Sequence, residues 1–394
     1  MRAASRKGAS WRKEEAGVFS PDGGIVDVPK MDEGESPALL LPLADDFHVH
    51  LRQDAMMKAV TPAVIHGGSD RVVVMPNTIP PIRTCAEAAD YRAKLQAIDP
   101  RVDYRMTLYL GQEVSADDLR ANADESGVRG VKSYPRGVTT NSEAGIESYT
   151  TYYPLFSEME KMGLTLHIHG EVPGVSVLTA EASFLPQLEE LHRAFPSLKI
   201  VLEHVSTAAA VLLVRRLGPT VGATVTAHHL DLTIDEVVGC SHNFCKPVAK
   251  MREDREAIRQ VVMDEGHPRF FLGSDSAPHP RHKKEIGMKA AAGCFTSPFL
   301  LAYLADTFVW GSSRYTDDDT TVTKRLPDFV GRFGAEFFGV PVKRYEEGKP
   351  AVELRKRAFT VPSVWGESIL GSEGAVVPFR SGDVLRYESR LVGL

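Results

Sequence analysis

Six side chains that can bind a metal or carry charge stand near the ends of short apolar runs of the sequence, namely His48, His50, Lys132, His169, His204 and Asp275. Imidazole nitrogens and carboxylate oxygens are ligands that Zn²⁺ takes in proteins, and a catalytic zinc site keeps one coordination position open to water. These residues therefore indicate a catalytic metal centre, provided that the fold brings the ends of the runs together.

The motif "HVH" contributes His48 and His50. In a β-strand, residues i and i+2 point to the same side, so these two rings can bind one ion. A lone H-x-H motif is weak, and most single histidines are ordinary core or surface residues. We interpret the histidines that lie away from the ends of the runs as such ordinary residues, and these are His66, His192, His242, His267 and His282. H-x-H combined with two later histidines and an aspartate is far more specific.

Two histidine pairs leave alternatives open. In "HIH" at 167–169 both rings would point inward. His169 is favoured as a ligand because it is nearer the end of its run, and His167 would lie one layer deeper and support a ligand from behind. Either ring of "HH" at 228–229 could approach the site, although neither is needed to complete the ligand set.

Lys132 ends the apolar run "GVRGVK" at 127–132. Burying an unpaired ammonium is costly, and an ammonium has no lone pair to offer a metal. Burial beside cations would lower its pKa from roughly 10.4 and free the amine to react. The alternative is a lysine whose stem is buried and whose charge reaches water.

The runs that carry these residues alternate with helical stretches. The β-rich runs lie at 44–51, 71–76, 104–110, 127–135, 164–171, 198–205, 221–229 and 269–278. Between them, Thr84 and Glu87 form a helix capping box and Gly163 is positioned to end a helix. Eight such alternations predict an α/β fold with a parallel sheet, and we favour a closed (β/α)8 TIM barrel over a doubly wound open sheet. The carboxyl ends of barrel strands share one face, which carries the active site.

Composition narrows the class of protein. The net charge of −6 argues against a nucleic-acid surface, and no apolar run approaches the roughly 20 residues that span a membrane. The four cysteines form no CxxC pair, which favours a reducing, cytoplasmic compartment. Residues 1–37, basic and then rich in Gly, Pro and acids, predict a disordered extension, with a mitochondrial presequence or an early start codon as alternatives. Residues 38–394 are expected to form a single barrel domain with a C-terminal extension.

The sequence resembles the amidohydrolase superfamily, and within it the short, monofunctional dihydroorotases. The resemblance is carried by the motifs "DDFHVHLR", "VVMPNTIPP", "GVKSYPRGVTTNSEAGI", "HIHGE", "EHVST" and "GSDSAPHPRHKKE". It runs from about residue 43 to the C-terminus and does not cover 1–37. It implies a metal-dependent TIM barrel that interconverts N-carbamoyl-L-aspartate and L-dihydroorotate in pyrimidine biosynthesis, and a homodimer.

The resemblance also implies two Zn²⁺ ions per chain and CO₂-derived carboxylation of the lysine. The ligands would be His48, His50 and Asp275 for the first ion, His169 and His204 for the second, and Lys132 between them. The carbamate on Lys132 is an anion with two oxygens and would bridge the ions beside a hydroxide. That hydroxide would attack the ring amide carbonyl, with Asp275 as general base and then general acid.

The small-molecule substrate keeps a carboxylate, which needs a forked cation. Arg52, two residues after His50, points inward in a strand and suits bidentate binding. By resemblance its partners are Asn77, His279 and the backbone near Ala292, while the backbone of Leu230 meets the edge of the pyrimidine ring. In the segment 136–146, Thr139 and Thr140 would offer hydroxyls from a loop that closes over the substrate.

Three rival functions remain at this point. A hydantoinase or dihydropyrimidinase also uses a bridging lysine, although Arg52, Asn77 and His279 favour a substrate with a carboxylate. A mononuclear deaminase would need no lysine on the fourth strand. A catalytically inactive barrel that serves as an assembly partner would be expected to lack ligands, and none is missing here.

Overall fold

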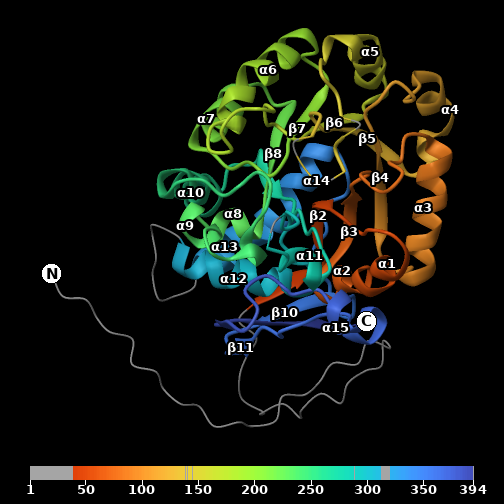
Figure 1. Cartoon of the computed structure of the whole chain (residues 1–394). Helices are drawn as coiled ribbons and strands as arrows, with labels where there is room; N and C mark the ends of the chain where they lie inside the picture. Colours follow the sequence, from red (N-terminus) through yellow and green to blue (C-terminus); the bar gives the residue numbers. More distant parts are fainter. Residues whose placement is uncertain are drawn as a thin grey trace. The chain divides into compact units, whose positions relative to one another are not determined.

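The computed structural model describes residues 39–137, 139, 141–143, 145–287, 289–311 and 320–393. The extension expected over 1–37 lies outside the described residues, and contacts group Ser36–Leu394 as one unit. Eight parallel strands follow one another around a barrel in chain order (Figure 1). They are β2 (Ala44–Val49), β3 (Ser69–Val74), β4 (Asp103–Tyr109), β5 (Val128–Ser133), β6 (Thr165–Ile168), β7 (Lys199–Leu202), β8 (Val221–Val225) and β9 (Phe270–Leu272). The predicted (β/α)8 barrel is confirmed.

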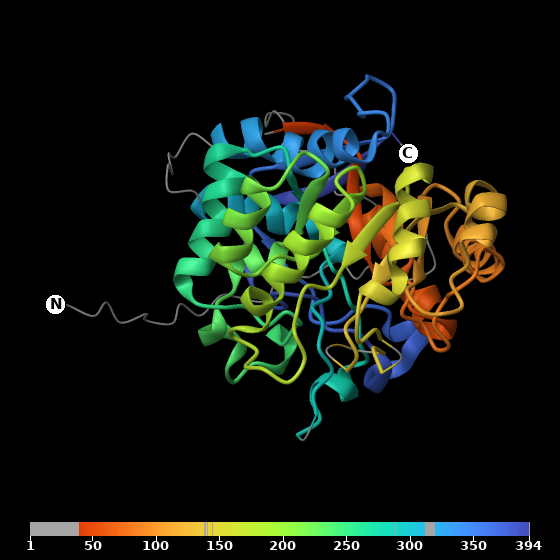
Figure 2. The same cartoon turned by 90° about the horizontal axis from the view of Figure 1, so that it is seen from above.

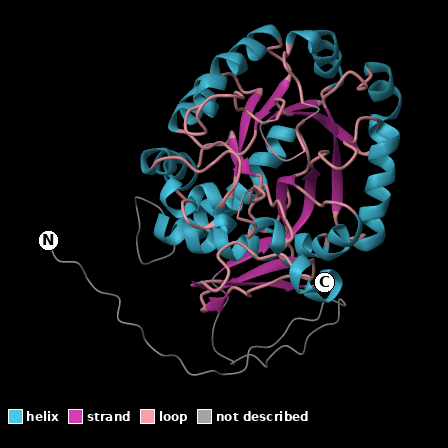
Figure 3. Cartoon of the chain, in the orientation of Figure 1, coloured by secondary structure: helices cyan, strands magenta, loops and turns pink. Residues whose placement is uncertain are grey.

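Most helices lie around the outside of the strands (Figures 2 and 3), whereas α14 covers one end of the barrel. Those between the barrel strands are α1 (Asp54–Val60), α2 (Pro62–His66), α3 (Cys85–Ile98), α4 (Ala116–Ser126), α5 (Tyr153–Met162), α6 (Ala180–Ala194), α7 (Ala208–Arg216), α8 (Ala227–Asp231), α9 (Ile234–Val237) and α10 (Arg252–Arg259). After β9 come α11 (Arg281–Lys284), α12 (Leu300–Gly311), α13 (Thr320–Pro327), α14 (Phe333–Phe338) and α15 (Glu367–Gly374). Short 3₁₀ or π segments are η1 (Thr150–Tyr152), η2 (Ser241–Asn243), η3 (Gln260–Glu265), η4 (Ser297–Phe299) and η5 (Asp328–Arg332).

Local sequence signals set several helix ends. Thr84 and Glu87 form the predicted capping box of α3, with the Thr84 side chain accepting from the Glu87 N–H. Gly163 ends α5 in the left-handed conformation at φ 68°, which glycine adopts without steric cost. None of the described helices is long and apolar enough to cross a membrane.

The barrel closes between β9 and β2 through residues just beyond β9. The Asp275 N–H donates to the His48 carbonyl at 2.9 Å, and the His50 N–H donates to the Ser276 carbonyl at 3.1 Å. The buried Asp46 carboxylate accepts from the Ser274 N–H at 2.8 Å. These bonds therefore place β2, the first strand of the barrel, next to the residues that follow β9, its last strand.

One end of the barrel is filled with aromatic side chains. Phe47 of β2 stacks on Phe338 of α14 with ring centroids 4.5 Å apart, and Phe271 of β9 meets Phe47 edge-on at 5.5 Å. A Cβ on Gly334 would lie 2.1 Å from the Phe47 ring, so only glycine lets α14 approach so closely. This plug leaves the opposite, carboxyl end of the strands for polar residues.

A separate antiparallel sheet joins the two ends of the described chain. It consists of β1 (Leu39–Pro42), β10 (Ala351–Arg355) and β13 (Glu388–Val392), in that order. The short strands β11 (Phe359–Thr360) and β12 (Val384–Leu385) form a second pair. The C-terminal segment is thus fastened to the strand that precedes the barrel.

Candidate metal centre and active site

The six residues singled out first all lie at the carboxyl ends of barrel strands. His48 and Lys132 belong to β2 and β5, and the others follow the ends of β2, β6, β7 and β9. All six residues are buried, and none has more than 7% of its surface exposed. His48, His50, His169, His204 and Asp275 line one cavity. We call the six residues together the candidate metal centre.

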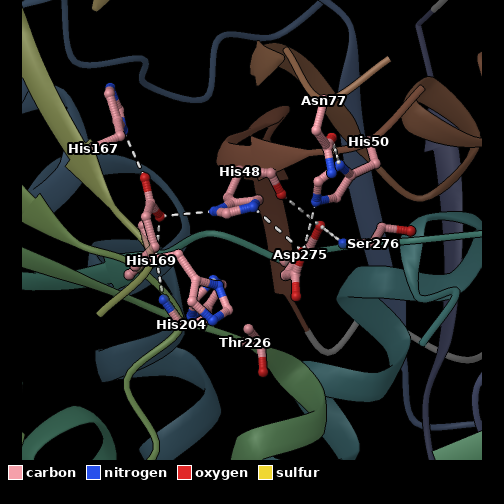
Figure 4. A network of polar contacts seen from close by, with 12 residues as sticks. His48, His50, Asn77, His167, His169, His204, Thr226, Asp275 and Ser276 are labelled. Carbon is pink, nitrogen blue, oxygen red and sulfur yellow. Dashed lines mark hydrogen bonds and ion pairs between the residues drawn. The ribbon is translucent and has the colours of Figure 1, made fainter. Parts of the chain in front are cut away.

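His48, His50 and Asp275 converge on a common point (Figure 4). The Nε2 atoms of His48 and His50 lie 3.3 and 3.0 Å from Oδ1 of Asp275. The Nδ1 atom of His50 is 2.8 Å from the Asn77 side-chain oxygen, so the rings are held from behind with Nε2 directed inward. Outer contacts of this kind orient histidines that bind metals.

The rings of His169 and His204 lie edge-on against each other and both line the cavity. Nδ1 of His169 lies 3.1 Å from Nε2 of His204, and Nε2 of His169 is 2.7 Å from the Glu171 carboxylate. Burial lowers the pKa of both imidazoles below the ordinary value of 6.5. At neutral pH they are therefore uncharged, which is the form that binds a metal.

Lys132 is fully buried, and its Nζ has no hydrogen-bond partner among the residues that the structure describes. The Nζ lies 5.1 Å from the centroid of the Tyr134 ring. Burial lowers the pKa of the amine from its ordinary value of 10.5 to about 8, although the charges of Glu203 and Asp275 oppose the shift. A buried amine without a partner is costly unless another group completes the site.

Glu203 is a central residue that the sequence analysis did not single out. Its carboxylate contacts Nδ1 of His48 at 2.8 Å, Nδ1 of His167 at 2.6 Å and the hydroxyl of Thr224. Burial opposes ionisation, but His48 and Lys132 hold the pKa of Glu203 well below its ordinary value. The only sequence signal was a carboxylate directly before His204. His167 itself lies one layer deeper, stacked on Phe338 at 5.8 Å.

Backbone strain is concentrated at this site. Arg52, His204 and Asp275 adopt positive φ angles of 58°, 42° and 45°, which are unfavourable for residues with a side chain. Such conformations cost about 1–3 kcal/mol each and persist where the surroundings enforce them, often at functional sites. The strain turns these three side chains into the cavity just beyond their strands.

Arg52 lies at one wall of the cavity with most of its predicted partners. Its Nε donates to the Pro278 carbonyl at 2.9 Å, and an Nη lies 3.2 Å from Nε2 of His279. Nε2 of His279 is in turn 2.9 Å from the Ala292 carbonyl oxygen. The cavity is also lined by residues that the sequence analysis named, Asn77, Thr139 and Ala292.

Leu230 is buried in α8, and its carbonyl accepts from Nε of Arg259 at 2.7 Å, so the contact of its backbone with the substrate stays a prediction. Lys246 also lines the cavity, although nothing in its spacing identified it. Thr140 lies outside the described residues. Asn141 of the same segment donates to the Asn77 carbonyl at 2.9 Å, which brings the segment against the site.

Known proteins similar to this chain were found by sequence and by structure. A family model for amidohydrolases matches residues 46–223. A probable dihydroorotase of Schizosaccharomyces pombe is 44% identical and covers 89% of this chain and 98% of its own length. A dihydroorotase of Saccharomyces cerevisiae is 37% identical, covering 89% of this chain and 97% of its own length.

Solved structures with a similar fold agree with the sequence matches. The crystal structure of dihydroorotase from Saccharomyces cerevisiae in complex with 5-fluoroorotic acid is similar at a TM-score of 0.81 and 36% identity, covering 90% of this chain and 98% of that one. An L-hydantoinase from Arthrobacter aurescens has a TM-score of 0.73 at 17% identity, covering 89% of this chain and 84% of that one, and shares the fold.

Proposed function

Because this chain belongs to the dihydroorotases of the amidohydrolase family, we propose that it interconverts N-carbamoyl-L-aspartate and L-dihydroorotate in pyrimidine biosynthesis. One observation carries the proposal beyond the family. The cavity is lined by a cluster of side chains that could hold a metal and, beside it, by the half-buried Arg52. An amide-cleaving centre next to a carboxylate-binding cation fits a cyclic amide that bears a carboxylate.

The proposal includes two Zn²⁺ ions. His48, His50 and Asp275 would hold one, His169 and His204 the other, and carboxylated Lys132 would connect them. The donor atoms fit, because two histidines and a carboxylate converge within 4.8 Å of one another and the Lys132 amine has no partner among the described residues. When bound, paired cations lower the pKa of water and polarise the carbonyl that is attacked.

The protonation state of Lys132 supports the proposed carboxylation. The lowered pKa of about 8 leaves a larger fraction of neutral amine than the ordinary value of 10.5 would. The amine lone pair adds to the carbon of CO₂, the N–C bond forms and one proton leaves to solvent. The product is a carbamate, whose two oxygens can each take a cation. This converts a costly buried group into a ligand.

Asp275 carries the proton in the proposed reaction. Burial favours its neutral form, but His48 and His50 hold its pKa well below the ordinary value, so the carboxylate is ionised. In hydrolysis it accepts the proton of the attacking water and donates it to the ring nitrogen that leaves. Ring closure runs the same steps backwards and consumes one carboxylate and one proton, so acid favours closure and alkali favours hydrolysis.

Arg52 would orient the substrate through its carboxylate. Its Nε is engaged by a backbone carbonyl and an Nη lies near His279, so the head group is fixed before the substrate arrives. Preorganised cations lose less entropy on binding. The contact between Arg52 and the substrate carboxylate would distinguish L-dihydroorotate from cyclic amides that lack a carboxylate.

A substrate panel tests this proposal. The metal-loaded chain is assayed with L-dihydroorotate, dihydrouracil and hydantoin. We expect rapid hydrolysis of L-dihydroorotate alone, and a smaller preference for it in Arg52→Gln. Equal or faster hydrolysis of dihydrouracil or hydantoin would assign a hydantoinase-type activity instead.

The proposal extends to the cellular setting. All four cysteines are free, which supports a reducing, cytoplasmic compartment. A homodimer is proposed from the family alone, and light scattering on the purified chain tests it through the molecular mass.

A further inference from the structure

A second cluster of metal-type side chains lies behind one wall of the cavity. It consists of His228 in α8, Cys245 and Cys294. Their ligand atoms all lie within 4.8 Å of one another, and all three residues are at most 1% exposed. None of them belongs to the candidate metal centre. We call these three residues the thiol cluster.

His228 is the unusual member of the cluster. Both of its ring nitrogens are buried without a hydrogen-bond partner among the residues that the structure describes. The adjacent His229 shows that such partners can be supplied here, since its nitrogens lie 2.9 Å from the Thr226 hydroxyl and 3.0 Å from the Pro247 carbonyl. Buried polar atoms without partners are rare and costly, so the His228 ring indicates a group that completes the site.

A buried cation lies beside the two cysteines. Lys284 is 4% exposed, and its Nζ donates to the carbonyls of Phe244 at 2.9 Å and Gly293 at 2.8 Å. These residues immediately precede Cys245 and Cys294, so one ammonium lies beside both sulfurs. A nearby cation stabilises a thiolate, which is the form that binds metals. Cys294 and His228 lower the pKa of Cys245 well below its ordinary value, whereas the contact with Cys245 and burial raise the pKa of Cys294, so Cys245 is the cysteine that favours a thiolate before a metal binds.

The donor set selects the class of ion. Two sulfurs and an imidazole nitrogen suit thiophilic cations such as Zn²⁺, whereas Mg²⁺ and Ca²⁺ require oxygen ligands. Cys245 Sγ contacts the Pro247 carbonyl at 3.3 Å, Cys294 Sγ contacts the His242 carbonyl at 3.7 Å, and the two thiols contact each other.

We propose that His228, Cys245 and Cys294 form an additional metal site that binds one thiophilic cation of the Zn²⁺ class, separate from the candidate metal centre. Binding releases the two thiol protons. Three side chains leave one position of a tetrahedral ion for a ligand such as water.

The ion would join α8 to two segments that form part of the cavity wall. Lys246 follows Cys245, Ala292 and Gly293 precede Cys294, and all three of these neighbours line the cavity. The Ala277 N–H also donates to the Cys294 carbonyl at 2.8 Å. The site would thus hold the wall on the Arg52 side in place without touching the substrate.

Cobalt substitution tests the site independently of activity. The candidate metal centre contains no cysteine, so a thiolate-to-Co²⁺ charge-transfer band can arise only from cysteines elsewhere. We expect the reduced, metal-free wild-type chain to develop this band within three equivalents of Co²⁺. Cys240→Ser removes a cysteine outside the cluster and should leave the band unchanged, whereas Cys294→Ser should abolish it.

His228→Gln provides a gentler variant in case Cys294→Ser fails to fold. It should weaken Co²⁺ binding at this site by more than the roughly 10–100-fold that loss of an outer contact causes. The proposal is overturned if the wild-type chain gives no thiolate band, or if a folded Cys294→Ser variant or the His228→Gln variant keeps the full band at wild-type affinity.

Discussion

Replacing Lys132 by methionine should stabilise the metal-free chain while destroying its metal-dependent activity. Methionine has a similar unbranched shape and no charge, so it fills the space of the lysine stem. The shift of the Lys132 pKa from 10.5 to about 8 is the measure of what burial costs the ammonium. At about 1.4 kcal/mol for each tenfold change in the ionisation constant, that shift corresponds to about 3 kcal/mol.

The stability that Lys132→Met adds to the metal-free chain depends on pH. The folded chain releases the Lys132 proton near pH 8, whereas the unfolded chain releases it near 10.5. The penalty is therefore complete below about pH 8 and fades as the pH rises towards 10.5. At pH 7 we expect Lys132→Met to raise the free energy of unfolding of the metal-free chain by about 1–3 kcal/mol, allowing for lost packing.

Urea denaturation of chelator-treated chains provides the assay, with hydrolysis of L-dihydroorotate by reloaded chains measured in parallel. Lys284→Met is the matched control, because Lys284 is also buried but donates two hydrogen bonds. It should destabilise the chain. If Lys132→Met destabilises the chain equally, the amine has a partner in the folded state and our reasoning is wrong. Activity close to the wild type in Lys132→Met would refute the bridging role.

Further predictions concern the residues around the centre. Arg52→Gln should lower kcat/KM for L-dihydroorotate by about 10–100-fold, since a hydrogen bond to a charged group contributes roughly 1.5–3 kcal/mol, while slow hydrolysis of dihydrouracil should change little. Glu203→Gln should weaken Zn²⁺ binding roughly 10–100-fold in chelator competition, because His48 loses the carboxylate that orients it. The pKa of Glu203 is held well below 4.5, so its stabilisation of the metal-free chain is present above pH 4.5 and is lost as the pH falls further. Urea titrations from pH 6 down to pH 3 should show a shallower loss in Glu203→Gln, and an unchanged slope would contradict the assignment.

The barrel and its metal-type residues could be predicted because both depend on local patterns. Alternation of short apolar runs with capped helices identifies the parallel strands, and each ligand stands at the end of such a run. His48 and His50 needed only the two-residue period of a strand to be placed on one side. The chemistry of a residue at a strand end is therefore readable from its type and position.

Non-local features were not readable in the same way. Lys246 reaches the cavity from the irregular chain between α9 and α10, where no period relates sequence position to direction. Glu203 contacts rings on two other strands, so its role appears only once the closed barrel brings the side chains of β2 and β6 within reach of the residues that follow β7. Pairing of β1 with β10 joins residues about 310 positions apart, which no local pattern specifies.

The most direct test of the account follows the reaction from both directions. Metal-loaded wild-type chain is mixed in separate samples with L-dihydroorotate and with N-carbamoyl-L-aspartate at one pH, and the ring absorbance is recorded to completion beside Asp275→Asn. The account predicts that both wild-type samples reach the same final ratio of the two compounds, with more closed ring at lower pH, and that Asp275→Asn converts neither. Wild-type chain that leaves both compounds unchanged with its metal bound would contradict it.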